Sequence, residues 1–149
     1  MPEREYSPDP KYQSLLLGRL IGQVFKSGLK STGTRAIYKA LDIIKEKTKK
    51  DPLELLDEAM KNISPVLEVK AKRIGGATYQ IPVPVVGPRR NTLAIRWLLT
   101  ATRSRKGKPF AAKLSAEIME AAEKRGSAIK KKEDIQKMAE ANRAFAHFA

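Results

Sequence analysis

Residues 66–86 read VLEVKAKRIGGATYQIPVPVV. Side chains alternate in character along residues 66–74 and again along residues 77–86, and such period-two alternation is typical of β-strands. Gly75 and Gly76 separate the two runs, and a Gly-Gly pair readily adopts the positive φ angles of a two-residue hairpin turn. The stretch therefore predicts a two-stranded β-hairpin arm.

Prolines limit how the second strand of this arm can pair. Pro82 and Pro84 have no amide hydrogen to donate to a ladder, so this strand must lie at an edge or stop pairing early. Gly87 and Pro88 end the arm. Because an isolated hairpin is only marginally stable in water, we expect the base of the arm to pack on helices while its tip reaches outward.

Two amphipathic helices are predicted before the arm, from apolar residues at helical spacing. Gly28 is placed to end the first helix, and Ser31 or Thr32 to cap the start of the second. The apolar faces comprise Leu16, Leu17, Leu20, Ile21 and Val24 in the first helix, and Ile37, Ala40, Leu41 and Ile44 in the second.

A third helix before the arm has a strong start signal. Asp51 can accept hydrogen bonds from the first turn, Pro52 suits the first helical position, and Glu54 completes a capping box. Pro65 closes the segment. The apolar face of this helix comprises Leu53, Leu56, Met60 and Ile63.

Three more helices are predicted after the arm, over residues 92–103, 109–124 and 133–148. The linkers between them, residues 104–108 and 126–132, are dense in Lys and Arg. The whole chain is thus predicted to be a single, mostly α domain, a six-helix bundle with a protruding two-stranded β-hairpin arm. The buried positions of the last three helices are expected to include Ala94, Trp97, Leu98, Ala101, Leu114, Ile118, Met119, Ala122, Ile135, Met138, Ala139, Asn142 and Phe145.

Charge points to a polyanionic partner. The chain of 149 residues carries 30 Lys and Arg against 16 Asp and Glu, a formal net charge of +14. Basic side chains dominate residues 11–50, 70–102 and 103–132, and residues 70–102 contain no acidic residue, whereas residues 51–69 are mainly acidic. Charge arranged in blocks indicates a shaped binding face, although a solvated basic surface would explain any one block.

The residue types needed for catalysis are nearly absent. His147 is the single histidine, and the sequence contains no cysteine. A His/Cys metal site is therefore excluded, and no phosphate-cradling GxxxxGK[ST] spacing surrounds Gly75 and Gly76. No enzymatic activity, metal or cofactor is expected. No apolar stretch is long enough for a membrane span.

The predicted arm carries groups suited to RNA. Alternation places Lys70 and Lys72 on one face and Arg73 on the other, while Tyr79 and Gln80 lie close to the turn. Cations bind phosphates, and an aromatic ring can stack on an unpaired base. The structural alternative is edge protection, because Lys and Pro discourage aggregation between strands.

Further basic clusters surround the predicted helix ends and linkers. Each alone is more often a solvated patch than a contact, but together they favour RNA or DNA. A DNA-compacting protein, whose two-stranded arm would enter a minor groove, is the alternative from another class, and a membrane-surface role is weaker. The candidate contacts in these clusters are Lys26, Lys30, Arg35, Arg89, Arg90, Arg96, Arg103, Arg105, Lys106, Lys108, Lys130, Lys131 and Lys132.

Several of these segments resemble those of a known family. Residues 70–82, KAKRIGGATYQIP, resemble the hairpin motif of the small-subunit ribosomal protein S-seven family. Residues 130–134 with 138–147 form a second match, KKKED followed by MAEANRAFAH. Residues 93–98, together with the region around Asp51, add shorter matches, so the resemblance covers nearly the whole chain.

The resemblance implies a helical bundle with an extended hairpin in the head of the small ribosomal subunit. It implies binding to the 3′ major domain of small-subunit rRNA, nucleation of head assembly, and a position near the exit-site tRNA and the messenger path. Neighbouring proteins of the S-eleven, S-nine and S-thirteen families are implied partners. The implied location is the ribosome in a bacterial cytoplasm, with a plastid or a mitochondrion as the other settings.

The same resemblance implies functional residues. rRNA contacts fall on the basic candidates of the arm and the clusters above, and exit-site contacts fall on the tip, Ile74 to Tyr79, including Gly75 and Gly76, and on Arg143. The first residues depart from the family pattern, because bacterial members commonly begin with an Arg-rich tail. Acidic residues surround Arg4 here, so an extra N-terminal rRNA anchor has no support in this sequence.

Overall fold

The computed structural model describes residues 7–24 and 30–148. These residues form six α-helices, one two-stranded sheet and a short 3-10 helix, which confirms the mostly α fold with a hairpin arm. The elements in chain order are α1 (Leu15–Val24), α2 (Lys30–Thr48), α3 (Pro52–Ile63), β1 (Leu67–Ile74), β2 (Ala77–Pro84), α4 (Pro88–Ser104), α5 (Phe110–Ala122), α6 (Ser127–Ala141) and η1 (Arg143–Phe148).

Strands β1 and β2 pair along their full length, and we call them the arm. Ile74 lies opposite Ala77 across a turn in which Gly75 and Gly76 have φ values of 57° and 85°. At the base, the Val85 amide donates to the Val66 carbonyl at 2.9 Å. Because hydrogen-bonded and non-bonded pairs alternate in an antiparallel ladder, this bond places both prolines of β2 at non-bonded positions, where they cost no ladder bond. The pairing therefore does not stop early.

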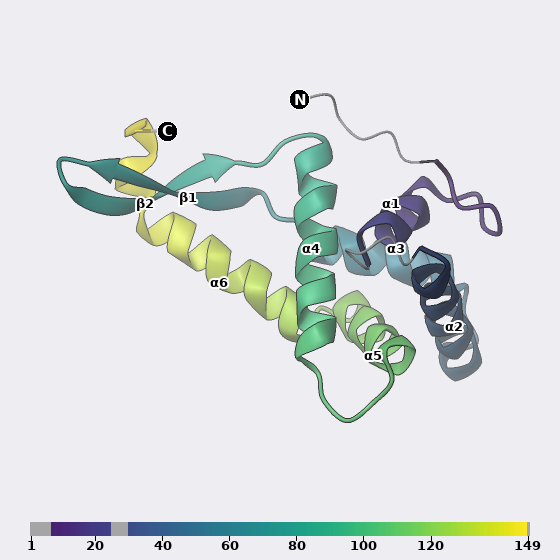
Figure 1. Ribbon diagram of the computed structural model, residues 1–149. Helices are drawn as coiled ribbons and strands as arrows, with labels where there is room; N and C mark the ends of the chain where they lie inside the picture. The colour runs from purple at the N-terminus through teal and green to yellow at the C-terminus, as the bar shows by residue number, and fades with distance from the viewer. Residues whose placement is uncertain (1–6, 25–29, 149) are drawn as a thin grey trace.

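The bundle surrounds one hydrophobic core. Helices α1 to α5 and the start of α6 contribute to it, and Figure 1 shows α4 standing between the arm and helices α1 to α3. Trp97 is 7% exposed, as expected for a packing residue. Met138, predicted to be buried, is 42% exposed, because it lies on the outer face of α6. The largest fully buried side chains of the bundle are Leu17, Leu20, Ile37, Leu41, Ile44, Leu56, Ile63, Ile95, Leu98, Leu114 and Ile118.

Helix starts were predicted well where the capping group is local. Asp51 caps α3, and its carboxylate accepts from the Leu53 amide at 3.0 Å with Pro52 at the first helical position. Among the described hydrogen bonds, none joins Glu54 to the Asp51 amide, so the capping box is not completed. The expected cap at Ser31 or Thr32 is wrong, because both residues lie inside α2. The expected end of the first helix at Gly28 falls outside the described residues.

The last helix begins earlier than its sequence pattern predicts. Helix α6 starts at Ser127 rather than at residue 133, and it ends at Ala141, where the chain tightens into η1. The buried Glu117 of α5 accepts a hydrogen bond from the Ala128 amide at 3.0 Å, so the α6 start is satisfied by a distant residue. Helix α4 also begins earlier, at Pro88, and therefore includes Arg89 and Arg90 in its first turn.

The arm is supported along one side. Figure 1 shows α6 running beneath the strands and η1 lying against them, while the turn extends past both. The rings of Tyr79 and Phe145 lie 4.9 Å apart between centroids. The tip therefore protrudes as expected, but the strands behind it are braced by the C-terminal segment.

Candidate nucleic-acid interface

The cations of the arm point to both of its faces. Lys70, Lys72 and Arg73 are all exposed. The register places Lys72 beside Tyr79 on one face and Arg73 beside Thr78 on the other. This arrangement allows phosphates to approach the arm from two sides.

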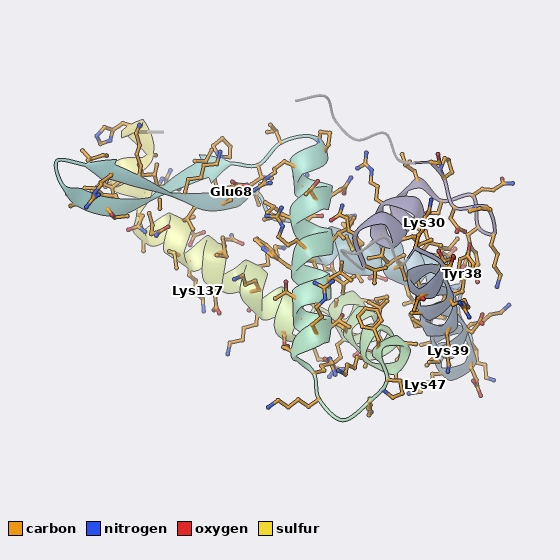
Figure 2. All side chains as sticks on the ribbon, viewed as in Figure 1. Lys30, Tyr38, Lys39, Lys47, Glu68 and Lys137 are labelled. Carbon is orange, nitrogen blue, oxygen red and sulfur yellow. The ribbon has the colours of Figure 1, made fainter. Side chains whose placement is uncertain are left out.

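The single carboxylate of the arm is neutralised internally. Glu68, labelled in Figure 2, is buried at the base of β1, and its Oε2 lies 3.2 Å from Nε of Arg89 on α4. This ion pair fixes the base of the arm to the first turn of α4. Beyond Glu68, every charged side chain of the arm is a cation, because the sequence from residue 70 to residue 102 contains no acidic residue.

Three arginines form a row along α4. Arg89, Arg96 and Arg103 are spaced seven residues apart and are exposed, so they share one face of the helix. At a rise of about 1.5 Å per residue, the row is roughly 21 Å long. Arg103 also donates from Nη2 to the Val24 carbonyl at 2.7 Å, which ties the end of α1 to α4.

Arg105 has an internal role that the sequence did not reveal. Its Nε lies 2.7 Å from Oε2 of the fully buried Glu117, and its Nη2 pairs with Oε2 of Glu120. Burial lowers the pKa of Arg105, but the bonds to both carboxylates outweigh it and leave the pKa raised. Its predicted contact with RNA stays a prediction, whereas Lys106 and Lys108 in the same linker are exposed.

The run of three lysines belongs to α6 and not to a linker. Lys130 and Lys131 are exposed, while Lys132 donates to the Asn62 carbonyl at 2.9 Å. Successive residues of a helix point about 100° apart, so these lysines do not form one patch. Arg90 likewise has an internal bond, from Nε to the Pro65 carbonyl at 3.2 Å.

The structure brings the two predicted exit-site elements together. Arg143 is exposed on η1, and Phe145 two residues later packs on Tyr79 near the tip of the arm. Contact with Phe145 also half-buries the Tyr79 ring, which competes with the predicted stacking of that ring on a base. The tip and the C-terminal segment therefore form one composite end of the molecule.

Comparison with known proteins identifies the family. The family model described as ribosomal protein S7p/S5e matches residues 1–143. The chain belongs to this family. It is therefore a ribosomal protein with a structural, non-enzymatic role.

Relatives match over nearly their full length. Small ribosomal subunit protein uS7 of Pelotomaculum thermopropionicum is 59% identical over 148 residues, which are 99% of this chain and 95% of the relative. The uS7 protein of Thermotoga petrophila is 54% identical over 97% of this chain and 94% of its own length. The uS7 protein of Thermotoga maritima is 51% identical over 98% and 94%.

The remaining basic candidates of this S7-family protein lie away from the arm. Lys30 and Arg35 are exposed on α2, and Figure 2 shows Lys30 on the side of the bundle opposite the arm. Lys26 lies outside the described residues. Helix α4 stands between α2 and the arm (Figure 1), so Lys30 and Arg35 are remote from the arm, and their predicted contact with rRNA stays a prediction.

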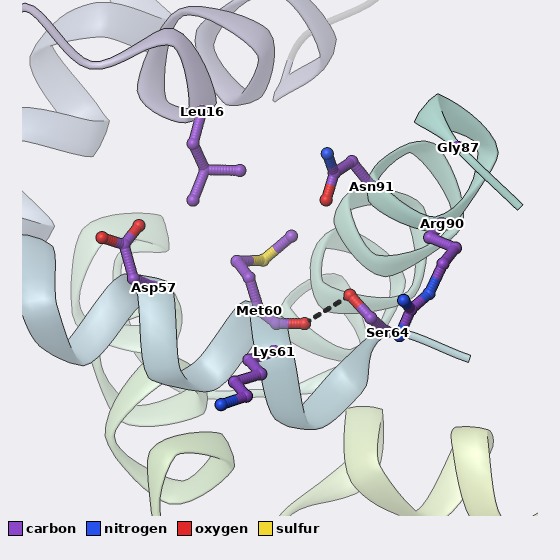
Figure 3. A pocket seen from close by; sticks show the side chains of 8 residues that line it. All are labelled: Leu16, Asp57, Met60, Lys61, Ser64, Gly87, Arg90 and Asn91. Atoms are coloured by element: carbon purple, nitrogen blue, oxygen red, sulfur yellow. Dashed lines mark hydrogen bonds between the residues drawn. The ribbon is translucent and has the colours of Figure 1, made fainter. Parts of the chain in front are cut away.

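One hollow of the surface lies near the junction of three helices. Figure 3 shows this hollow of about 510 Å³ between α1, α3 and the start of α4, whose Ser64 hydroxyl donates to the Met60 carbonyl at 2.7 Å. Within residues 7–24 and 30–148, no three His, Cys, Asp or Glu side chains are placed to hold a metal ion. The same part of the chain contains no helix long and apolar enough to cross a membrane.

Proposed function

We propose that this small-subunit ribosomal protein binds the 3′ major domain of the rRNA and nucleates assembly of the subunit head. It works in the ribosome of a bacterial cytoplasm, as the bacterial origin of its relatives supports. Its tip and C-terminal segment lie near the exit-site tRNA and the messenger. Proteins of the S-eleven, S-nine and S-thirteen families are its neighbours.

The observation that carries this proposal is the set of exposed cations on the arm, with no exposed carboxylate among them. Lys70, Lys72 and Arg73 are exposed, and the only acidic residue of the arm is buried and paired with Arg89. Phosphate binding by such cations releases counterions, which supplies affinity without base contacts. Arg89, the first member of the arginine row of α4, is tied to the base of the arm through Glu68.

The composite end supports the part of the proposal that concerns tRNA and messenger. The glycine turn, at residues 75–76, extends beyond η1 and is exposed, while Arg143 is exposed on η1, which is held against the arm through Phe145. A narrow, braced and cationic end fits a groove between nucleic-acid strands. The apposition of Tyr79 and Phe145 keeps both elements in a fixed relation.

Filter binding to a head-domain rRNA fragment tests the proposal. The triple substitution Lys70→Ala, Lys72→Ala and Arg73→Ala should reduce the slope of log K against log salt by roughly 2–3, at about 0.7–0.9 per phosphate contact. Its matched control replaces three exposed lysines outside the arm, Lys39, Lys47 and Lys61, and should keep the slope nearly unchanged. Equal loss in both variants would contradict the proposal, and equal affinity for random duplex DNA would favour the DNA-compacting alternative.

A further inference from the structure

A second hollow, lined by four lysines, lies at the end of the bundle opposite the arm. It has a volume of about 470 Å³ and is formed where α2 ends and α3 begins. None of its lysines belongs to the arm, to the arginine row or to the lysine run of α6. The residues that line it are Lys11, Tyr12, Asp42, Lys45, Lys49, Lys50, Asp51 and Pro52.

Among the described ion pairs, none involves a lysine of this hollow. Arg89 and Arg105, by contrast, are each paired with a carboxylate. Among the described residues, no carboxylate lies within ion-pair distance of any of the four ammonium groups of the hollow, although two aspartates line it. One of these, Asp51, uses its carboxylate to cap α3. The hollow therefore presents unpaired positive charge to a ligand.

One wall of the hollow is firmly built. Asp9 is 1% exposed, and its carboxylate accepts from the Tyr12 amide at 2.7 Å and from the Tyr38 hydroxyl. The rings of Tyr12 and Tyr38 meet edge to face, with centroids 5.8 Å apart. Lys11 Nζ lies 5.3 Å from the Tyr12 centroid and 5.0 Å from the Tyr38 centroid. Cation–π contacts of this kind hold the ammonium group in place.

The opposite wall is a fixed turn. Lys49 has a φ of 60°, a left-handed conformation, and its amide donates to the Lys45 carbonyl at 2.9 Å. The Lys50 amide donates to the Thr48 hydroxyl at 3.3 Å. These bonds fix the backbone that carries three of the four lysines.

We propose that this hollow binds the phosphate backbone of an RNA segment distinct from the one on the arm. The inference rests on the proposed function, and it means that the bundle holds RNA at both ends. Four ammonium groups against two aspartates leave a net positive hollow, and the protein is ribosomal, so RNA is the polyanion that the site meets. An acidic protein segment is the competing occupant.

Lysines at the end of α2 also have a purely structural use, because cations stabilise a helix C-terminus. Lys47 separates the two roles. It lies in the same last turn as Lys45 and is exposed, but it does not line the hollow. Lys39, also labelled in Figure 2, is a second exposed lysine on α2 outside the hollow.

The test uses two full-length variants. The hollow variant combines Lys45→Gln and Lys50→Gln, and the control variant combines Lys39→Gln and Lys47→Gln. Both variants lose two positive charges. In filter binding to the head-domain rRNA fragment, the hollow variant should reduce the salt slope by about 1.4–1.8, while the control keeps the parent slope. Equal slopes would overturn the inference and leave the proposed function intact, whereas absence of salt-dependent binding by the parent protein would overturn both.

Directed cleavage identifies the occupant. Because the chain contains no cysteine, an iron chelate can be tethered at one position, through Lys50→Cys or, on the arm, Arg73→Cys. Radicals from the first position should cleave rRNA strands that the second position does not cleave. Cleavage of the same nucleotides from both positions, or of no rRNA from Lys50→Cys in an assembled subunit, would overturn the inference, and the latter result would indicate a protein occupant.

Discussion

The bundle and the arm are stabilised in different ways. Of the largest fully buried side chains in the described chain, Ile81 alone comes from the hairpin. Ile81 and Ala139 are buried, but they do not belong to the continuous core of the bundle. The arm thus depends on a small apolar contact area of its own, on the α6–η1 segment, and on the Glu68–Arg89 pair at its base.

Because of this difference, the bundle should determine folding stability, whereas the arm should mainly determine RNA binding. Apolar burial is the dominant favourable term in folding, and nearly all of it lies in the bundle. The exposed cations of the arm contribute little to folding, because surface charges are solvated in both states. Substitutions in the two regions should therefore affect different measurements.

The largest effect is expected in the bundle core. Leu98 is fully buried on α4, and Leu98→Ala should lower the free energy of unfolding by about 2–5 kcal/mol through lost burial and the cavity left behind. Urea denaturation followed by circular dichroism measures this loss. A smaller loss of unfolding free energy than an apolar substitution in the arm causes would show that the bundle is not the main source of stability.

The corresponding change in the arm is Ile81→Ala. A buried Ile→Ala change costs about 2–5 kcal/mol, but here we expect most of it to appear as easier local opening of the arm. Amide hydrogen exchange should accelerate in residues 67–84 while the amides of α4 keep their protection. If α4 loses protection to the same extent, the arm and the bundle form a single cooperative unit and the distinction fails.

The smallest effect concerns a polar contact of the bundle with no counterpart in the arm. Burial, with the hydrogen bond to Asp9, raises the pKa of Tyr38 from 10.0 to about 12. Since the folded pKa is raised, the stabilisation is complete below pH 10 and is lost as the pH rises toward 12. Tyr38→Phe should cost about 1–2 kcal/mol near neutral pH.

Urea titrations across the alkaline range check this prediction. The unfolding free energy of the parent protein should fall between about pH 10 and pH 12 more steeply than that of Tyr38→Phe. The matched control is Tyr79→Phe, because Tyr79 also loses a hydroxyl but lies on the arm and does not contact Asp9. Parallel curves for the parent and Tyr38→Phe would show that the Asp9 contact does not stabilise the folded state.

Local chemistry decided which parts of the fold could be predicted from the sequence. The Gly75–Gly76 turn and the Asp51 cap depend on adjacent residues, and both are found as expected. The start of α6 could not be predicted, because its capping group is Glu117, eleven positions earlier in the chain. The support given to the arm by η1 has the same origin, since Tyr79 and Phe145 are far apart in sequence.

The candidate interface was also predictable only where local sequence determines the structure. Exposure of Lys70, Lys72 and Arg73 follows from strand alternation, which the sequence shows directly. The internal bonds of Arg105 and of Lys132 depend on partners from other helices. The sequence therefore shows where each cation lies along the chain, but only packing determines whether that cation is exposed or forms an internal bond.

The bracing of the arm by the C-terminal segment has a consequence for synthesis. The supporting segment ends at Phe148, 64 residues after the end of β2 at Pro84, so at roughly 5–20 residues per second the strands wait about 3–13 s for their support. During that wait the nascent hairpin exposes both strand edges to other chains. Pro82 and the lysines of β1, which discourage such pairing, act as safeguards before the partner helix exists.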